Sequence, residues 1–319
     1  MSYILLAIGF LLLIKGADYF VSGASGLAKK LRVPALLIGM TIVAFGTSAP
    51  EAAVSISATL KGNSGIAIGN ILGSNLFNAS FIIGLAALLY PLAVEKQTVK
   101  KEIPIMLLSA LALLALGADT FLTGSSIPMT LERGDGIVLL LLFSVFMYYS
   151  IEVARNSRES MEIEDVVMKG EYIKLVVYTL GGVIGIIVGG NFVVTSATEI
   201  ATSFGLSETI IGLTIVAIGT SLPELVTSVV AALKKQPDIA VGNIVGSNIF
   251  NGLFIIGVSS VISPLVIDDS LIVELILNVI ITIVLLWFSR SHHRISKIEG
   301  AILLCSYLIY TVYLGFSIS

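Results

Sequence analysis

Charged residues are scarce in this sequence. Of its 319 residues only 12% are Asp, Glu, Lys or Arg, whereas 56% are hydrophobic, and the mean hydropathy is +1.02. A soluble domain has about a quarter of its residues charged, so the composition excludes a soluble protein and indicates an integral membrane protein. The net charge of −3, with no basic cluster among aromatic residues, gives no indication of a nucleic-acid partner.

Cysteine and histidine are almost absent as well. Cys305 alone cannot form an internal disulfide and offers no metal-binding spacing. The only histidines, His292 and His293, fall in a predicted loop beside arginines, so no Ser/His pair lies at membrane depth for an intramembrane protease. The sequence therefore predicts no enzyme, no resident cofactor and no obligate protein partner.

Long apolar runs make up most of the chain instead. A membrane-spanning helix needs roughly 20 apolar residues, with a range of about 17–25. The first run has neither a basic n-region nor a cleavage site, so we interpret it as a span and not as a signal peptide. The sequence predicts an all-α membrane protein with ten transmembrane helices, at about 3–27, 36–60, 65–90, 103–118, 135–151, 172–198, 209–233, 239–262, 271–289 and 297–316.

One long polar segment divides the ten spans into two halves of five. Residues 152–171 form the predicted linker between a first half, 1–151, and a second half, 172–319. With the N-terminus outside, 15 of the 18 Lys and Arg residues fall in inward loops, two in outward loops and one, Lys15, within the first span. The positive-inside rule then places both termini outside and the linker in the cytoplasm, in a multi-pass protein of the plasma (inner) membrane.

An internal repeat gives the two halves their relationship. Residues 39–84 align without a gap to residues 212–257 at an offset of 173, with 28 of 46 positions identical. Because each half has an odd number of spans, the second half enters the membrane upside down relative to the first. Inverted repeats of this kind are common in secondary transporters, with the substrate site at the midplane between the repeats.

Each repeat copy places a carboxylate in an apolar span beside a proline. In the first copy Thr47, Glu51 and Ser55 share one helix face, and Pro50 cannot donate a backbone hydrogen bond, which frees carbonyls around Ala44 to Thr47. The next span carries Asn70, Ser74 and Asn78 at the same four-residue spacing. The second copy repeats the pattern with Thr220, Pro223, Glu224, Ser228, Asn243, Ser247 and Asn251.

Carboxylate, hydroxyl, amide and carbonyl oxygens without sulfur or imidazole indicate a site for a hard cation. Two glutamates supply a charge of −2, which one calcium ion neutralises. The alternatives are protonated glutamates and hydrogen bonds that merely join helices, the latter above all for Asn70, Asn75, Asn243 and Asn248. We also expect six glycines to let backbones approach closely: Gly46, Gly69, Gly73, Gly219, Gly242 and Gly246.

The first and sixth spans are rich in glycine and lack strong ligands. We therefore expect that they can slide over the remaining helices. Lys15 and Asp18, three residues apart in the first span, are best explained as a local ion pair or as side chains that extend to the membrane surface.

The repeats resemble a known family. The motifs GTSAPE and GTSLPE, each followed by GN-x-x-GSN-x-x-N, are similar to the two alpha-repeats of sodium/calcium exchangers in the calcium/cation antiporter superfamily. The resemblance implies that Glu51 and Glu224 bind both calcium and sodium, and that the carbonyls of Thr47 and Thr220 bind calcium. It also implies that the flanking sodium sites are completed by Ala44, Ser48, Ser74, Asn78, Ala217, Ser221, Ser247 and Asn251.

One position departs from part of that family, and one motif is missing. Some members, including those that co-transport potassium, have Asp where this chain has Asn251, so the amide argues against potassium dependence. The signature of proton/calcium exchangers is absent, which favours sodium as the counter-ion. The expected function is Na+/Ca2+ exchange by alternating access; H+/Ca2+ or other divalent-cation exchange is the alternative, and a cation channel fits two kinked inverted repeats less well.

Overall fold

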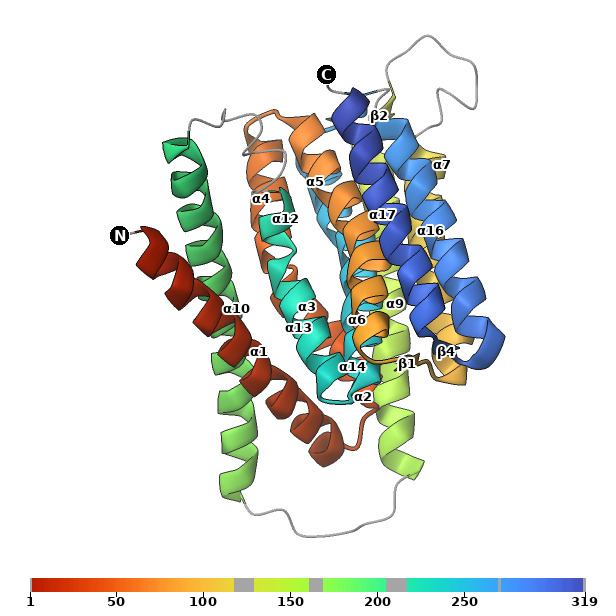
Figure 1. Ribbon diagram of the computed structural model, residues 1–319. Helices are drawn as coiled ribbons and strands as arrows, with labels where there is room; N and C mark the ends of the chain where they lie inside the picture. The colour runs from red at the N-terminus through yellow and green to blue at the C-terminus, as the bar shows by residue number, and fades with distance from the viewer. Residues whose placement is uncertain (1, 118–128, 161–168, 205–216, 269–270, 318–319) are drawn as a thin grey trace.

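The computed structural model describes residues 2–117, 129–160, 169–204, 217–268 and 271–317, and it is a bundle of helices that run roughly parallel, with α1 crossing obliquely (Figure 1). The first half contains α1 (Ser2–Leu31), α2 (Ala35–Ile38), η1 (Gly39–Val43), α3 (Ala44–Thr47), α4 (Ala49–Leu60), α5 (Ser64–Leu76), η2 (Phe77–Ile82), α6 (Ile83–Leu89), β1 (Leu92–Ala93), η3 (Thr98–Glu102), α7 (Ile103–Gly117), β2 (Thr130–Leu131) and α9 (Arg133–Ser160).

The described elements of the second half follow the same general order, with no counterpart of η3 before α16 among the described residues. It contains α10 (Lys169–Ser203), α12 (Ala217–Thr220), α13 (Leu222–Leu233), α14 (Pro237–Ile249), η5 (Phe250–Ile255), α15 (Ile256–Ile262), β3 (Leu265–Val266), α16 (Leu271–His292), β4 (Arg294–Ile295) and α17 (Lys297–Ser317).

Helix lengths agree with the predicted spans. Among the described residues seven helices are long and apolar enough to cross a membrane, and the bent pair 35–47 and 49–60 gives an eighth. The other two predicted spans correspond to α7 and to α12–α13; of the latter span, residues 209–216 lie outside the described residues. The predicted linker is partly helical, because α9 continues to Ser160 and α10 begins at Lys169.

The second span breaks where the proline motif predicts. The chain bends by 48° between α3 and α4, and Ser48 at the break has φ −82° and ψ 7°. Ser221 occupies the same position between α12 and α13, with φ −88° and ψ 4°. The proline that follows each serine by two residues has no backbone N–H to continue the helical hydrogen bonds across the break, so a new helix begins beside each site carboxylate.

Wider helical turns mark the third and eighth spans. The π-helices η2 and η5 each continue an α-helix, α5 and α14 respectively, directly after the GSN-x motif. Insertions of this kind are rare and occur often at functional sites. They were not predictable from the sequence, since nothing in the apolar periodicity distinguishes a π turn from an α turn.

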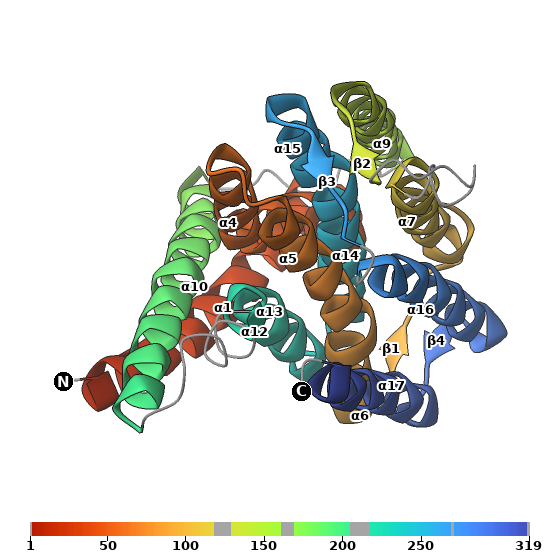
Figure 2. The same cartoon turned by 90° about the horizontal axis from the view of Figure 1, so that it is seen from above.

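Helices α1 and α10 form a pair beside the remaining helices (Figure 2). Their contact depends on glycine: a Cβ atom at Gly182 would lie 2.6 Å from the backbone nitrogen of Phe20 and 2.7 Å from the carbonyl oxygen of Gly16. In the middle of the same view lie α4, α5, α13 and α14, flanked on the far side by α7, α9, α16 and α17. Glycine thus lets α1 and α10 pack closely on each other, and the sliding of these two spans over the remaining helices stays a prediction.

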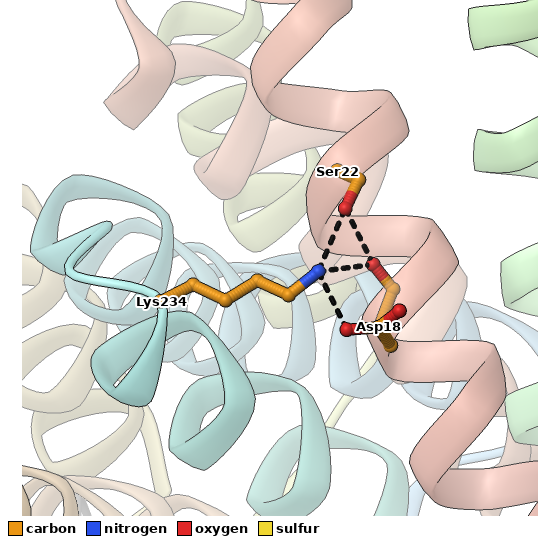
Figure 3. A network of polar contacts seen from close by, with 3 residues as sticks. All are labelled: Asp18, Ser22 and Lys234. Carbon is orange, nitrogen blue, oxygen red and sulfur yellow. Dashed lines mark hydrogen bonds and ion pairs between the residues drawn. The ribbon is translucent and has the colours of Figure 1, made fainter.

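An ion pair joins α1 to the end of α13, and it corrects the expected pairing of Asp18. The Lys234 ammonium group, at the end of α13, lies 2.7 Å from Asp18 Oδ1 and also donates to the Asp18 carbonyl and to Ser22 Oγ, each at 2.7 Å (Figure 3). Asp18 therefore pairs with another helix and not with Lys15. A distant cation was not recognisable from the local spacing.

Two short antiparallel ladders connect the halves. Strand β1 pairs with β4 through Leu92 and Ile295, and β2 pairs with β3 through Leu131 and Leu265. They lie at opposite ends of the bundle in Figure 1. Each ladder ties a loop of one half to a loop of the other, which holds the helices between them in register.

Candidate cation site

Two carboxylates lie at the centre of the bundle. Glu51 and Glu224 are fully buried, at 0% exposure, in the first turns of α4 and α13. The first four N–H groups of an α-helix have no partner within the helix, and the helix dipole is positive at that end. The broken spans therefore stabilise negative charge inside the bundle at the two positions where the sequence places it.

Serines connect each carboxylate to both repeats. Ser48 donates to Glu224 Oε1 at 2.8 Å, and Ser221 donates to Glu51 Oε1 at 3.1 Å, so both serines at the breaks cross to the other half. Within each half, Ser74 lies 3.4 Å from Glu51 Oε1 and Ser247 lies 3.3 Å from Glu224 Oε1. Each glutamate thus lies in a small hydrogen-bonded group with one serine from each repeat.

Four buried oxygens of the predicted site residues have no hydrogen-bond partner. They are the Oε2 atoms of Glu51 and Glu224 and the Oδ1 atoms of Asn78 and Asn251, all in residues with 0% exposure. A buried acceptor without a partner is costly, and a buried unpaired carboxylate is more so. A cation satisfies acceptors that no N–H or O–H reaches. Two carboxylate and two amide oxygens are ligands of the kind that hard cations prefer.

The threonines and alanines of the predicted site lie beside this cluster. Thr47 donates to Asn243 Oδ1 at 3.0 Å, and Thr220 lies 3.4 Å from Asn70 Oδ1, so each side chain contacts the opposite repeat. The Ala44 carbonyl accepts a backbone bond from Ser48 at 2.9 Å and is not left free as the proline argument predicted. Ala217 begins α12, and its side chain lies outside the described residues.

Asn70 and Asn243 join neighbouring spans. Asn70 donates to Ser55 Oγ at 2.9 Å, and Asn243 donates to Ser228 Oγ at 3.0 Å. These bonds agree with the interpretation of both amides as contacts between helices. Of the glycines expected at close backbone contacts, Gly246 meets the Met40 backbone, whereas no atom lies within 4 Å of a Cβ placed at Gly73.

Two other buried carboxylates, Glu102 and Glu274, also have an Oε2 atom without a hydrogen-bond partner, but they belong to different contacts. Glu102 accepts a hydrogen bond from Tyr149, and Glu274 accepts one from Tyr310 at 3.0 Å. Each pair joins the fourth span of its half to the fifth. In the described part of the chain no three His, Cys, Asp or Glu side chains cluster as a metal centre would require, so the candidate site relies on two carboxylates with neutral oxygens.

The equivalent faces of the two halves differ in exposure. Asn70 and Gly73 in α5 are half-buried, whereas their counterparts Asn243 and Gly246 in α14 are buried. The candidate span of α14 is 94% buried against 78% for that of α5. The two halves therefore surround the site unequally, with α5 more exposed than α14.

Comparisons with known proteins agree with this geometry. The family described as "Sodium/calcium exchanger protein" matches residues 1–152 and 174–316. The chain belongs to the sodium/calcium exchanger family. As a member of it, the protein is a transporter and not an enzyme.

Relatives in this family match over nearly the whole chain. The "Putative antiporter CaxA" of Alkalimonas amylolytica is 39% identical and the "Sodium/calcium exchanger MaX1" of Methanosarcina acetivorans is 33% identical, each with 98% of both chains covered. A solved structure of the sodium-calcium exchanger NCX_Mj, soaked with 2.5 mM Na+ and 10 mM Sr2+, matches with a TM-score of 0.85 and 31% identity over 98% of both chains. That match confirms the predicted fold with ten transmembrane helices.

Two further relatives of the exchanger bear on its location and counter-ion. The "Inner membrane protein YrbG" of Escherichia coli is 38% identical over 83% of this chain and 81% of its own. The "Ca(2+)/H(+) antiporter ChaA" of Bacillus subtilis is 26% identical over 86% of this chain and 82% of its own. The chain is thus a multi-pass membrane protein of a family of cation/Ca2+ exchangers.

The contacts that hold the predicted ligands were not evident from the sequence. Ser48 and Ser221 bond the carboxylate of the opposite repeat, and Asn75 and Asn248 contact Asn251 and Asn78 respectively. The available signal was the spacing of Asn75 and Asn78, three residues apart and repeated at Asn248 and Asn251. That spacing places two amides on one helix face in each half.

Proposed function

We propose that this exchanger carries Na+ and Ca2+ in opposite directions across the membrane by alternating access. One observation carries the proposal: the two inverted repeats contribute equally to four buried oxygens that lack partners, at Glu51, Asn78, Glu224 and Asn251. A site built from both halves is accessible to either side when the halves exchange their arrangements. The remaining predicted ligands are Ala44, Thr47, Ser48, Ser74, Ala217, Thr220, Ser221 and Ser247.

The charge of the site supports exchange in preference to leak. Two ionised carboxylates without a cation leave −2 buried in the bundle, which is strongly unfavourable. An occupied site is neutralised by one calcium ion or by sodium ions, so only loaded states cross readily. With three sodium ions exchanged per calcium, as the family resemblance implies, one charge moves per cycle at about 2.3 kcal/mol per 100 mV.

Uptake of radiolabelled calcium into proteoliposomes tests the proposal. Vesicles loaded with sodium are compared with vesicles that have only a proton gradient, for wild type and Glu51→Gln. We expect uptake driven by internal sodium and lost in the variant, because Gln cannot neutralise the ion. The matched control is Glu274→Gln, a buried carboxylate whose Tyr310 bond survives the change; its uptake should persist.

Other outcomes identify other functions. Uptake driven by protons alone would make the chain an H+/Ca2+ antiporter, the activity named for the ChaA relative. Calcium flux that needs no counter-ion and does not saturate would indicate a channel. No calcium flux under either gradient would refute calcium transport.

The proposal includes an orientation in the plasma (inner) membrane. Both termini lie outside and the 152–171 linker lies in the cytoplasm, because the inward loops hold nearly all the basic residues. Phosphatase fused to the C-terminus should be active in intact cells. Phosphatase activity only from a fusion within the linker would show that the orientation is the opposite one.

A further inference from the structure

A continuous chain of hydrogen bonds links four asparagines across the two repeats, in the order Asn251, Asn75, Asn248 and Asn78. We propose that Asn75 and Asn248 are positioning residues that aim the amide oxygens of Asn78 and Asn251 at the transported cation. This inference rests on the proposed function and assigns these two residues a role beyond joining helices.

The backbone fixes which way the first two amides point. Asn248 Nδ2 donates to the carbonyl oxygen of Asn75 at 2.9 Å, and Asn75 Nδ2 reaches the carbonyl oxygen of Asn248 at 3.5 Å. A backbone carbonyl can only accept, so the NH2 end of each amide must face it. The oxygen of each amide therefore points the other way.

Those oxygens then fix the orientation of the other two amides. Asn75 Oδ1 accepts from Asn251 Nδ2 at 3.0 Å, and Asn248 Oδ1 accepts from Asn78 Nδ2 at 3.1 Å. If Asn78 or Asn251 turned over, two oxygens would face each other at hydrogen-bond distance. With their NH2 groups held in this way, the Oδ1 atoms of Asn78 and Asn251 remain buried without partners.

Orientation decides whether an amide attracts or repels a cation. Its oxygen is a ligand for a hard cation, whereas its NH2 group carries only donors. Each orienting bond runs between repeats, from α5 and η2 to α14 and η5. The ligand of one half is therefore aimed by the other half, as Ser48 and Ser221 already do for the glutamates.

Partners that orient metal ligands contribute strongly to metal affinity. Their substitution typically costs about 10–100-fold in affinity, and we expect a loss in this range for Asn75→Ala. The concentration of calcium for half-maximal exchange should rise while the maximal rate changes much less. A role in helix joining alone would instead lower the melting temperature with little change in affinity.

Double-mutant cycles on cation binding to the purified full-length protein test the crossed pairing. Calcium and sodium titrations are compared for Asn75→Ala, Asn251→Ala and the double variant. Once Asn251 is replaced, Asn75→Ala should have little further effect. The control cycle combines Asn75→Ala with Asn78→Ala, two residues of one helix with no mutual bond among those found, and its effects should add.

The mirror cycle of Asn248→Ala with Asn78→Ala replaces the first if one variant fails to fold, as judged by its melting temperature. Additive effects in both crossed cycles would overturn the inference. Wild-type protein that binds neither cation would overturn the proposed function, and the inference with it. Cation binding with crossed coupling but without exchange would refute only the exchange activity.

Discussion

Two glycines at equivalent positions of the repeat have different surroundings, so their substitution tests the packing. Gly73 and Gly246 occupy the same position of the repeat, 173 residues apart. A Cβ at Gly246 would lie 2.3 Å from the carbonyl oxygen of Met40 and 2.5 Å from its Cα. A Cβ at Gly73 would have no neighbouring atom within 4 Å. Gly→Ala should therefore have opposite effects at the two positions.

The magnitude follows from the distances. Ordinary contact begins near 3.4 Å, so Gly246→Ala requires the Met40 backbone to move by about an ångström. Such overpacking costs typically 1–3 kcal/mol. Alanine gains about 1 kcal/mol over glycine within a helix at both positions, so this gain cancels in the comparison. Gly246→Ala should be less stable than Gly73→Ala by about 1–3 kcal/mol, or several degrees in melting temperature.

Transport adds a second readout. If the two halves exchange their arrangements during the transport cycle, the protein has a second state. In that state Gly73 packs against a backbone as closely as Gly246 does in this structure. Gly73→Ala should then fold and bind cations normally but exchange them slowly, about tenfold for every 1.4 kcal/mol lost in the second state. Equal melting temperatures for the two variants would refute the packing argument. Wild-type exchange rates in Gly73→Ala would refute the swap of arrangements.

Three further predictions concern the ion pair between α1 and α13, the exposure of position 70, and the transported ions. Lys234→Met should change the exchange rate by less than about fivefold. The Lys234 and Asp18 side chains are 28% and 48% exposed, and ion pairs with such exposure contribute at most about 1 kcal/mol. A change in the rate by about a hundredfold would contradict this reasoning. In a Cys305→Ala background, a thiol reagent should label Asn70→Cys faster than Asn243→Cys, since only position 70 is partly exposed. Calcium uptake should not require potassium, and loss of uptake on its removal would refute our interpretation of the amide at Asn251.

The sequence predicted the fold well because membrane burial constrains every span. Apolar run length predicted the ten spans, which the NCX_Mj match confirms, and the repeat with its odd span count predicted the inversion. The proline after Ser48 predicted a break that the structure contains. Helix ends were less predictable: α9 continues to Ser160 through polar sequence, since a helix satisfies its own backbone whatever side chains it carries.

The site was predictable in its chemistry and not in its connections. Carboxylates stand out in an apolar span, so Glu51 and Glu224 were evident from sequence. The partner of Ser48 was not, because its bond crosses to a residue 176 positions away. Periodicity reports which residues share a helix face, whereas contacts such as those of Lys234 depend on how separate helices pack.

The amide at position 251 connects ligand orientation with charge. An ionised carboxylate there could not donate to Asn75 Oδ1, which lies 3.0 Å from Asn251 Nδ2, and two oxygens would face each other across that contact. It would also raise the charge of the site from −2 to −3, beyond what one calcium ion neutralises. In this chain the bonds that aim Asn78 and Asn251 require an amide at each, and those amides keep the charge at −2.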